Sequence, residues 1–261
     1  MNENIKWGAA AVAVVGLAIG GFLYFSKGNQ PVEPVVAAPA KPVVPAEPPI
    51  KHPVAASDGN QALPSLDESS ASMQNALSDL FGKQSVERYV VSDDLIRHIV
   101  VTVDNLTEPK AAERLRPLKP APGKFVAGGT EDSPLLDPSN YERYKPLVQL
   151  FRSTDTQRLV ATYVRYYPLF QESYENLGHP PQYFNDRAVE VIDQLLATPD
   201  VPGPVALTQP GVQYEYADPK LESLAAGQKI LIRMGGDNAR AVKAKLRELR
   251  AALVAQDEKR K

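Results

Sequence analysis

The sequence contains no cysteine. This absence excludes disulfide bonds, thiol catalysis, iron–sulfur clusters, cysteine-based zinc sites and a lipidated N-terminal cysteine. Histidine is also scarce, with three residues in 261, which argues against a His-rich metal centre. The formal net charge is only −2, which argues against a chain that binds nucleic acid over its whole length. We therefore expect no metal, no cofactor and no nucleic-acid partner.

Three common catalytic motifs are missing as well. The chain has no glycine-rich nucleotide loop, no G-x-S-x-G elbow and no H-E-x-x-H pair. These absences disfavour a common hydrolase, kinase or dehydrogenase, but they do not exclude an enzyme of another kind.

A long run without charge lies near the start of the chain. Residues 7–26 are twenty uncharged residues between Lys6 and Lys27, and a helix of that length spans roughly 30 Å, the thickness of the hydrocarbon core of a bilayer. Aromatic residues at both ends of the run suit the membrane interface. A cleaved signal peptide is disfavoured because no small-residue cleavage site follows closely. We predict an uncleaved transmembrane anchor at 7–26.

The charges that flank this run give only a slight bias in orientation. They favour residues 1–6 as a cytoplasmic head, with the rest of the chain in the periplasm. Gly16 and Gly20 form a G-x-x-x-G pair, which can let two membrane helices approach closely. These two glycines are the candidate residues for a homodimer through the membrane helix, although glycine is common in such helices in any case.

Proline is concentrated in the next segment. Nine of the 24 prolines fall before residue 65, and proline removes backbone donors and stops helices and central strands. Residues 27–64 are therefore predicted to be a disordered Pro/Ala/Val-rich linker that acts as a passive tether. Fully extended, such a linker reaches roughly 110 Å at about 3.1 Å per residue.

Residues 65–253 have the pattern of one helical domain, followed by a charged tail at 254–261. We expect a mainly α fold of about five to six helices with at most a short strand or hairpin. Residues 212–217 are the one strand candidate, and the proline-rich stretch 107–139 is expected to be irregular. Helical spacing, caps and stop signals indicate helices within 65–82, 92–106, 139–153, 155–178, 183–199, 218–234 and 237–254. Asp155, Asp218 and Asp237 are the expected caps of three of these helices, and Gly178 is the expected stop of the helix within 155–178. The β-branched run within 92–106 leaves a strand possible there.

Carboxylates cluster on two of these helices. Asp186, Glu190 and Asp193 share one face of the helix that begins near Phe184. Glu172 and Glu175 lie on the preceding helix. A carboxylate pair can cleave a glycosidic bond, and three carboxylates can hold Ca²⁺ or Mg²⁺. The alternative is a solvated face on which Arg187 pairs with Glu190 one turn on.

Tyrosines recur at helical spacing along residues 155–178. The stripe that includes Tyr166 and Tyr174 can be a platform on which a sugar stacks, or it can be core packing. His98 and His179 are too isolated in the sequence to be read as metal ligands.

The last predicted helix has two distinct faces. Its apolar seam comprises Ala239, Val242, Leu246, Leu249 and Leu253, and we expect it to pack against the helix at 219–234. A basic stripe lies beside the seam and comprises Arg240, Lys243, Arg247 and Arg250. Such a stripe can meet an anionic partner or lipid surface, can be a solvated face, or can pair with the acidic helix at 184–197.

Two long segments carry a family resemblance, namely 167–199 and 216–253, and the shorter segments 63–77 and 97–106 agree with it. Over about residues 63–253 the chain resembles bacterial proteins grouped only as a domain of unknown function, number 3014. The resemblance implies a bacterial envelope setting, and it brings no activity and no catalytic residue.

Together these features predict a non-catalytic interaction or scaffold module, tethered to the inner membrane by residues 7–26 and facing the periplasm. Its partner would be an envelope protein or an anionic surface. The alternative is a peptidoglycan-active hydrolase that uses Glu172 or Glu175 with Asp186 or Glu190.

Overall fold

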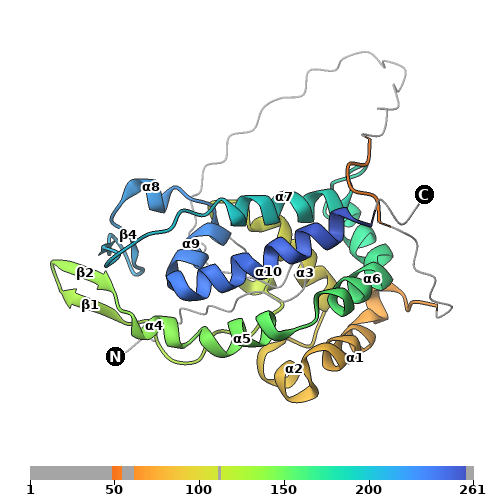
Figure 1. The fold of residues 1–261 in the computed structure, drawn as a ribbon, viewed down its shortest axis with the longest axis horizontal. Coiled ribbons are helices and arrows are strands. Elements are labelled where there is room, and N and C mark those ends of the chain that lie inside the picture. Colours follow the sequence, from red (N-terminus) through yellow and green to blue (C-terminus); the bar gives the residue numbers. More distant parts are fainter. Residues whose placement is uncertain (1–48, 55–61, 111–112, 257–261) are drawn as a thin grey trace, which may run out of the picture.

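The computed structural model describes residues 49–54, 62–110 and 113–256. Within these residues the chain forms ten α-helices, two 3-10 turns and two small antiparallel hairpins (Figure 1). The expectation of a mainly α domain is confirmed. The expected number of five to six helices was too low, and the count also exceeds the seven helical segments indicated by the sequence. The segments 139–153 and 218–234 are each split into two helices, and the short helix Lys83–Tyr89 was not anticipated.

The predicted membrane anchor at 7–26 lies outside the described residues. Among the residues that are described, no helix combines the length and the apolar character needed to cross a bilayer.

The first three helices pack as a group. They are α1 (Ser69–Phe81), α2 (Lys83–Tyr89) and α3 (Leu95–Asn105), with 3-10 turns at Leu66–Glu68 and Glu113–Leu115. Gly82 ends α1 with a φ of +82°, a conformation that glycine adopts without strain. The short helix α2 was not expected, because its seven residues carry too little apolar periodicity to be recognised.

The middle of the chain forms α4 (Ser139–Glu142), α5 (Lys145–Ser153), α6 (Thr156–Asn176) and α7 (Phe184–Leu196). The predicted cap of α6 is confirmed, since the Asp155 carboxylate accepts a hydrogen bond of 2.8 Å from the backbone N–H of Arg158. Gly178 follows α6 with a φ of +96°, which agrees with the predicted stop signal.

The predicted helix at 218–234 is two helices, α8 (Pro219–Glu222) and α9 (Ala226–Arg233). Asp218 caps α8 as expected, accepting from the backbone N–H of Lys220 at 2.9 Å. The last helix, α10, runs Gly236–Val254. Asp237 was expected to cap it, but that prediction was wrong, because the N-cap is Gly235 with φ 84° and ψ 154°. A Cβ atom at Gly235 would lie 2.6 Å from the ring of Tyr141, so only glycine fits there.

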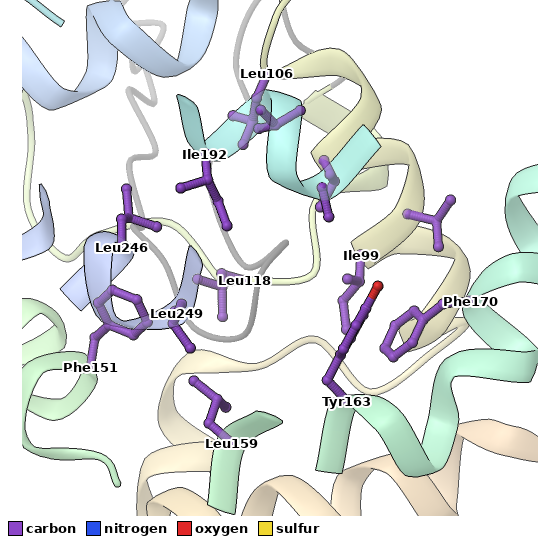
Figure 2. Packing of buried hydrophobic residues seen from close by; sticks show 14 of the residues in the cluster. Ile99, Leu106, Leu118, Phe151, Leu159, Tyr163, Phe170, Ile192, Leu246 and Leu249 are labelled. Atoms are coloured by element: carbon purple, nitrogen blue, oxygen red, sulfur yellow. The ribbon is translucent and has the colours of Figure 1, made fainter. Parts of the chain in front are cut away.

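Helix α10 lies between α7 and α5 in the view of Figure 1 and contacts α5, α6, α7 and α9. The five residues of its predicted seam are buried, each at most 7% exposed. Leu246 and Leu249 lie in the same core cluster as Phe151 of α5 and Ile192 of α7 (Figure 2). The seam therefore packs on several helices and not mainly on the segment 219–234 that was expected.

Two hairpins lie at one end of the domain (Figure 1). Strand β1 (Ala127–Thr130) pairs with β2 (Ser133–Leu136), and β3 (Leu207–Thr208) pairs with β4 (Glu215–Tyr216). The backbone N–H of Leu136 donates to the carbonyl of Val205 at 2.8 Å, which joins the two hairpins. The strand expected within 212–217 is confirmed as β4. The β1–β2 hairpin, in contrast, forms inside the stretch that was expected to be irregular.

A second, smaller core cluster lies beneath the hairpins, and its fully buried members are Leu136, Val205, Leu207, Tyr216 and Ile232. The hydroxyl of Tyr216 donates to the carbonyl of Lys229 at 2.6 Å. This bond fixes β4 on α9, so the hairpins are part of the domain's packing.

Candidate functional site

The first turn of α7 holds a segment that comes from the predicted linker. Residues 49–54, here called the strap, lie beside the start of α7 (Figure 1). The Asp186 carboxylate accepts two consecutive backbone N–H groups of the strap, Lys51 at 3.0 Å and His52 at 2.7 Å. The Asn185 side chain donates to the carbonyl of His52 at 2.8 Å. Adjacent side chains of one helical turn therefore hold the backbone of one dipeptide.

Asn185 is anchored in the core of the domain. It is fully buried, and its amide oxygen accepts a hydrogen bond of 3.1 Å from the hydroxyl of Tyr163. Burial raises the pKa of Tyr163 well above its ordinary value, so this hydroxyl stays a donor. Val54, at the end of the strap, packs against the main core cluster. We call the pair Asn185 and Asp186 the α7 clamp.

A groove of about 350 Å³ continues beside the strap. Pro49 and Lys51 form one wall of the groove. The residues that line the rest of it come from α6, α7 and the loop between them, and they are Tyr174, Gln182, Tyr183, Asp186, Arg187 and Glu190. The groove therefore combines two tyrosines with both signs of charge.

Arg187 forms the floor of the groove and ties α7 to α3. Its guanidinium donates to the Asp104 carboxylate at 2.8 Å, to the Asp104 carbonyl at 2.8 Å and to the Thr107 hydroxyl at 2.5 Å. It also donates to Glu190 at 3.0 Å. Burial alone would lower the pKa of Arg187, but the bond to Glu190 and the charge of Asp104 outweigh it and raise the pKa. The cation is thus fully engaged in holding the two helices together.

His179 completes this network from the loop after α6. Its ring stacks on Tyr174, with ring centroids 4.6 Å apart, and its Nε2 lies 3.2 Å from the Asp104 carboxylate. Burial, together with the charge of Asp104, raises the pKa of Tyr174 to about 12. His179 therefore holds the loop on α6 by a ring stack and on α3 by a polar contact, and Gln171 of α6 adds a hydrogen bond of 2.8 Å to the carbonyl of Gln182.

A family model described as "Protein of unknown function (DUF3014)" matches residues 95–250. The chain belongs to this family. The resemblance seen in the sequence is thereby confirmed, over a shorter range than 63–253. No curated protein and no solved structure matches the chain. Within the DUF3014 match lie Asp104, His179, Arg187 and the α7 clamp, whereas the strap precedes it.

The predicted catalytic carboxylates of this DUF3014 member do not converge on one point. Asp186 is used by the strap, and Glu190 is paired with Arg187 although its side chain is 65% exposed. Glu175 accepts a hydrogen bond of 2.8 Å from the side chain of Gln171. Glu172 is exposed and does not line the groove. Only Asp186 and Glu190 share the groove.

Among the described residues, no group of three or more histidine or carboxylate side chains is placed to hold a metal ion. Asp193, the third carboxylate of the predicted cluster, instead pairs with Arg250 of α10. The cluster seen in the sequence is thus divided among three separate interactions.

The two candidate tyrosines lie in the core. Tyr166 and Tyr174 are each 1% exposed. The hydroxyl of Tyr166 is 2.6 Å from the Ser72 hydroxyl and 3.0 Å from the Ser72 carbonyl, which joins α6 to α1. Tyr174 lines the groove, and His179 stacks on its ring. The stripe therefore follows the core-packing alternative and not that of an open platform.

The basic stripe of α10 is not one continuous free face. Lys243 is 7% exposed, and its ammonium donates to the carbonyl of Thr198 and lies 3.4 Å from the Asp200 carboxylate. Arg250 pairs with Asp193, with one bond of 2.9 Å, and Arg240 pairs with Asp237. Arg247 alone of the four is exposed with no hydrogen bond or ion pair to the described residues. Of the alternatives for the stripe, pairing with the acidic helix at 184–197 therefore holds for Arg250, through Asp193.

The candidate dimerisation residues Gly16 and Gly20 lie outside the described residues, so self-association through the membrane helix stays a prediction.

The sequence interpretation did not anticipate three functional residues of this site. His179 was dismissed as isolated, and Asp104 and Asn185 were not singled out. Asp104 is 83 positions from Arg187 in the chain, so no local pattern connects them. Asn185 and Asp186 together in the first turn of a helix, where polar side chains meet unpaired backbone groups, were the one signal available.

Proposed function

We propose that this chain is a non-catalytic interaction or scaffold module of the bacterial envelope, tethered to the inner membrane by residues 7–26 and facing the periplasm. The observation that supports a non-catalytic role most directly is the engagement of the candidate carboxylates. Asp186 holds the strap and Glu190 holds Arg187, so neither is free to exchange a proton with a substrate without first giving up a structural bond.

The strap also supports the tether. Residues 49–54 lie within the predicted linker 27–64 and are bonded to the α7 clamp, and Asn185 of the clamp is itself bonded to Tyr163 in the core. In the proposed tether, this contact holds one part of the linker on the domain.

A peptidoglycan-active hydrolase remains the second candidate, because Asp186 and Glu190 both line the 350 Å³ groove. Two carboxyl groups flanking a scissile glycosidic bond are the usual requirement of such enzymes. Glu190 is the carboxylate to substitute in a test of this candidate, because its side chain is more exposed than that of Asp186.

Incubation of the purified full-length chain with peptidoglycan separates the two candidates. We expect no soluble muropeptides from the wild type. Release that is lost in Glu190→Gln and kept in Glu172→Gln, a control carboxylate outside the groove, would establish the hydrolase instead.

A further inference from the structure

The hydrogen bonds between the strap and α7 all use the backbone of the strap, within the residues that the structure describes. Asp186 accepts the N–H groups of Lys51 and His52, and Asn185 donates to the carbonyl of His52. The side chains of Ile50 and Lys51 are exposed, whereas that of His52 is partly buried. The three hydrogen bonds of the α7 clamp therefore recognise an extended backbone with two consecutive N–H groups and involve no side chain of the strap.

The strap has the composition of a pre-organised ligand. Pro49 lies two residues before the clamped dipeptide and Pro53 directly follows it. A proline fixes its own φ at about −65° and disfavours the helical region for the residue before it, so Pro53 restricts His52 to an extended conformation. A segment that is already restricted toward its bound conformation loses less conformational entropy on binding. The groove beside it is lined by Tyr183, Arg187 and Glu190, among other residues.

From this geometry we infer that the α7 clamp and its groove are a peptide-binding site for extended, proline-flanked segments, and that residues 49–54 of the same chain are its ligand in cis. The inference rests on the proposed function, which it deepens by naming the site and the ligand class of the interaction module. A free peptide of the same backbone chemistry competes with the strap for the site.

Two strap variants of the full-length chain separate backbone recognition from side-chain recognition. Lys51→Pro with His52→Pro removes both N–H donors and empties the clamp. Lys51→Ala with His52→Ala is the matched control, because it changes the same side chains and keeps both donors. Each chain, purified in detergent, is titrated against a fluorescein-labelled peptide of residues 49–54, and binding is read by fluorescence anisotropy.

We expect the double-proline variant to bind the peptide at least about tenfold more tightly than the wild type, because a cis ligand reduces the fraction of open sites. The double-alanine variant should bind like the wild type. Adding Asp186→Ala to the double-proline variant should abolish binding, and adding Asp193→Ala, a carboxylate on the same helix that does not contact the strap, should leave it intact. Circular dichroism confirms that each variant is folded.

Absence of peptide binding to the folded double-proline variant would overturn the inference, as would binding that is unaffected by Asp186→Ala. Either result would make the strap a fixed part of the domain. The proposed function would be untouched by that failure, because it is tested separately by muropeptide release and membrane topology.

Discussion

At the scale of single residues, Arg187 is the side chain on which most of the site depends. It is 16% exposed and bonds Asp104 on α3, while Asp104 is itself 19% exposed and also contacts His179. Removing one partner of such a half-buried pair leaves the other charge without compensation, which costs more than the pair contributes when intact.

We therefore expect Arg187→Met to lower the free energy of unfolding by about 3 kcal/mol. The matched control is Glu190→Gln, which removes an exposed partner of the same guanidinium and should cost less than about 1 kcal/mol. Urea unfolding at equilibrium measures both. Equal small losses would contradict the role assigned to Asp104 and Arg187.

The buried tyrosines predict a dependence on alkaline pH. Burial raises the pKa of Tyr167 and of Tyr174 to about 12, from an ordinary value of 10. Below pH 10 both hydroxyls are protonated in the folded and the unfolded chain. Between pH 10 and 12 the unfolded chain loses these protons first, so the stability that they contribute below pH 10 is lost as the pH rises toward 12.

The measurement is the free energy of unfolding across this window for the wild type and for Tyr167→Phe. We expect the phenylalanine variant to lose less stability with rising pH, because one tyrosine that titrates differently in the two states is gone. Identical slopes for the two proteins would show that Tyr167 ionises equally easily in both states.

At the scale of elements, α10 shows why a charge pattern on a helix does not establish a binding face. The four basic residues share one stripe, yet Lys243 is buried against the end of α7, while Arg247 is exposed. Reversing the charge of all four residues would therefore combine a change in the core at Lys243 with a change on the surface at Arg247. Single substitutions at these two residues separate the two effects.

We expect Lys243→Glu to destabilise the domain by at least about 3 kcal/mol, because it places a carboxylate against the Thr198 carbonyl and near Asp200. Arg247→Glu, one turn further on, should change stability by no more than about 0.5 kcal/mol. Thermal melting of the two single variants measures both losses of stability. A comparable loss in both would contradict the assignment of Lys243 as a structural residue and Arg247 as a surface residue.

The helices were largely predictable from the sequence, because local signals specify them. Asp155 and Asp218 are side-chain caps, and the seam of α10 has regular spacing, so these elements were found with their buried faces. The β1–β2 hairpin was missed because Gly128, Gly129 and Pro134 resemble loop residues, and because one of its bonds to the rest of the domain goes to Val205, 69 residues after Leu136.

The candidate site was predictable only in part. The pairing of Arg187 with Glu190 follows from helical spacing and was expected, and it is confirmed at 3.0 Å. The bond of Asp186 to the strap joins residues 134 and 135 positions apart, across the boundary that composition draws between linker and domain. Long-range backbone recognition of this kind leaves no periodic trace in a sequence.

At the scale of the whole molecule, the proposed anchor at 7–26 and the proposed linker precede a helical domain, and residues 49–54 contact that domain at α7. The described domain is one continuous main core with a smaller cluster beneath the hairpins. Its groove lies beside the strap, and Asp186 in the first turn of α7 both lines the groove and bonds the strap.

The claim that this domain is tethered and faces the periplasm is tested most directly by paired fusions at the C-terminus of the full-length chain. We predict that an alkaline phosphatase fusion is active and found in the membrane fraction, while a fluorescent protein that folds only in the cytoplasm is dark. Deletion of residues 7–26 should remove both phosphatase activity and membrane association. A bright fluorescent fusion with an inactive phosphatase fusion would contradict the account.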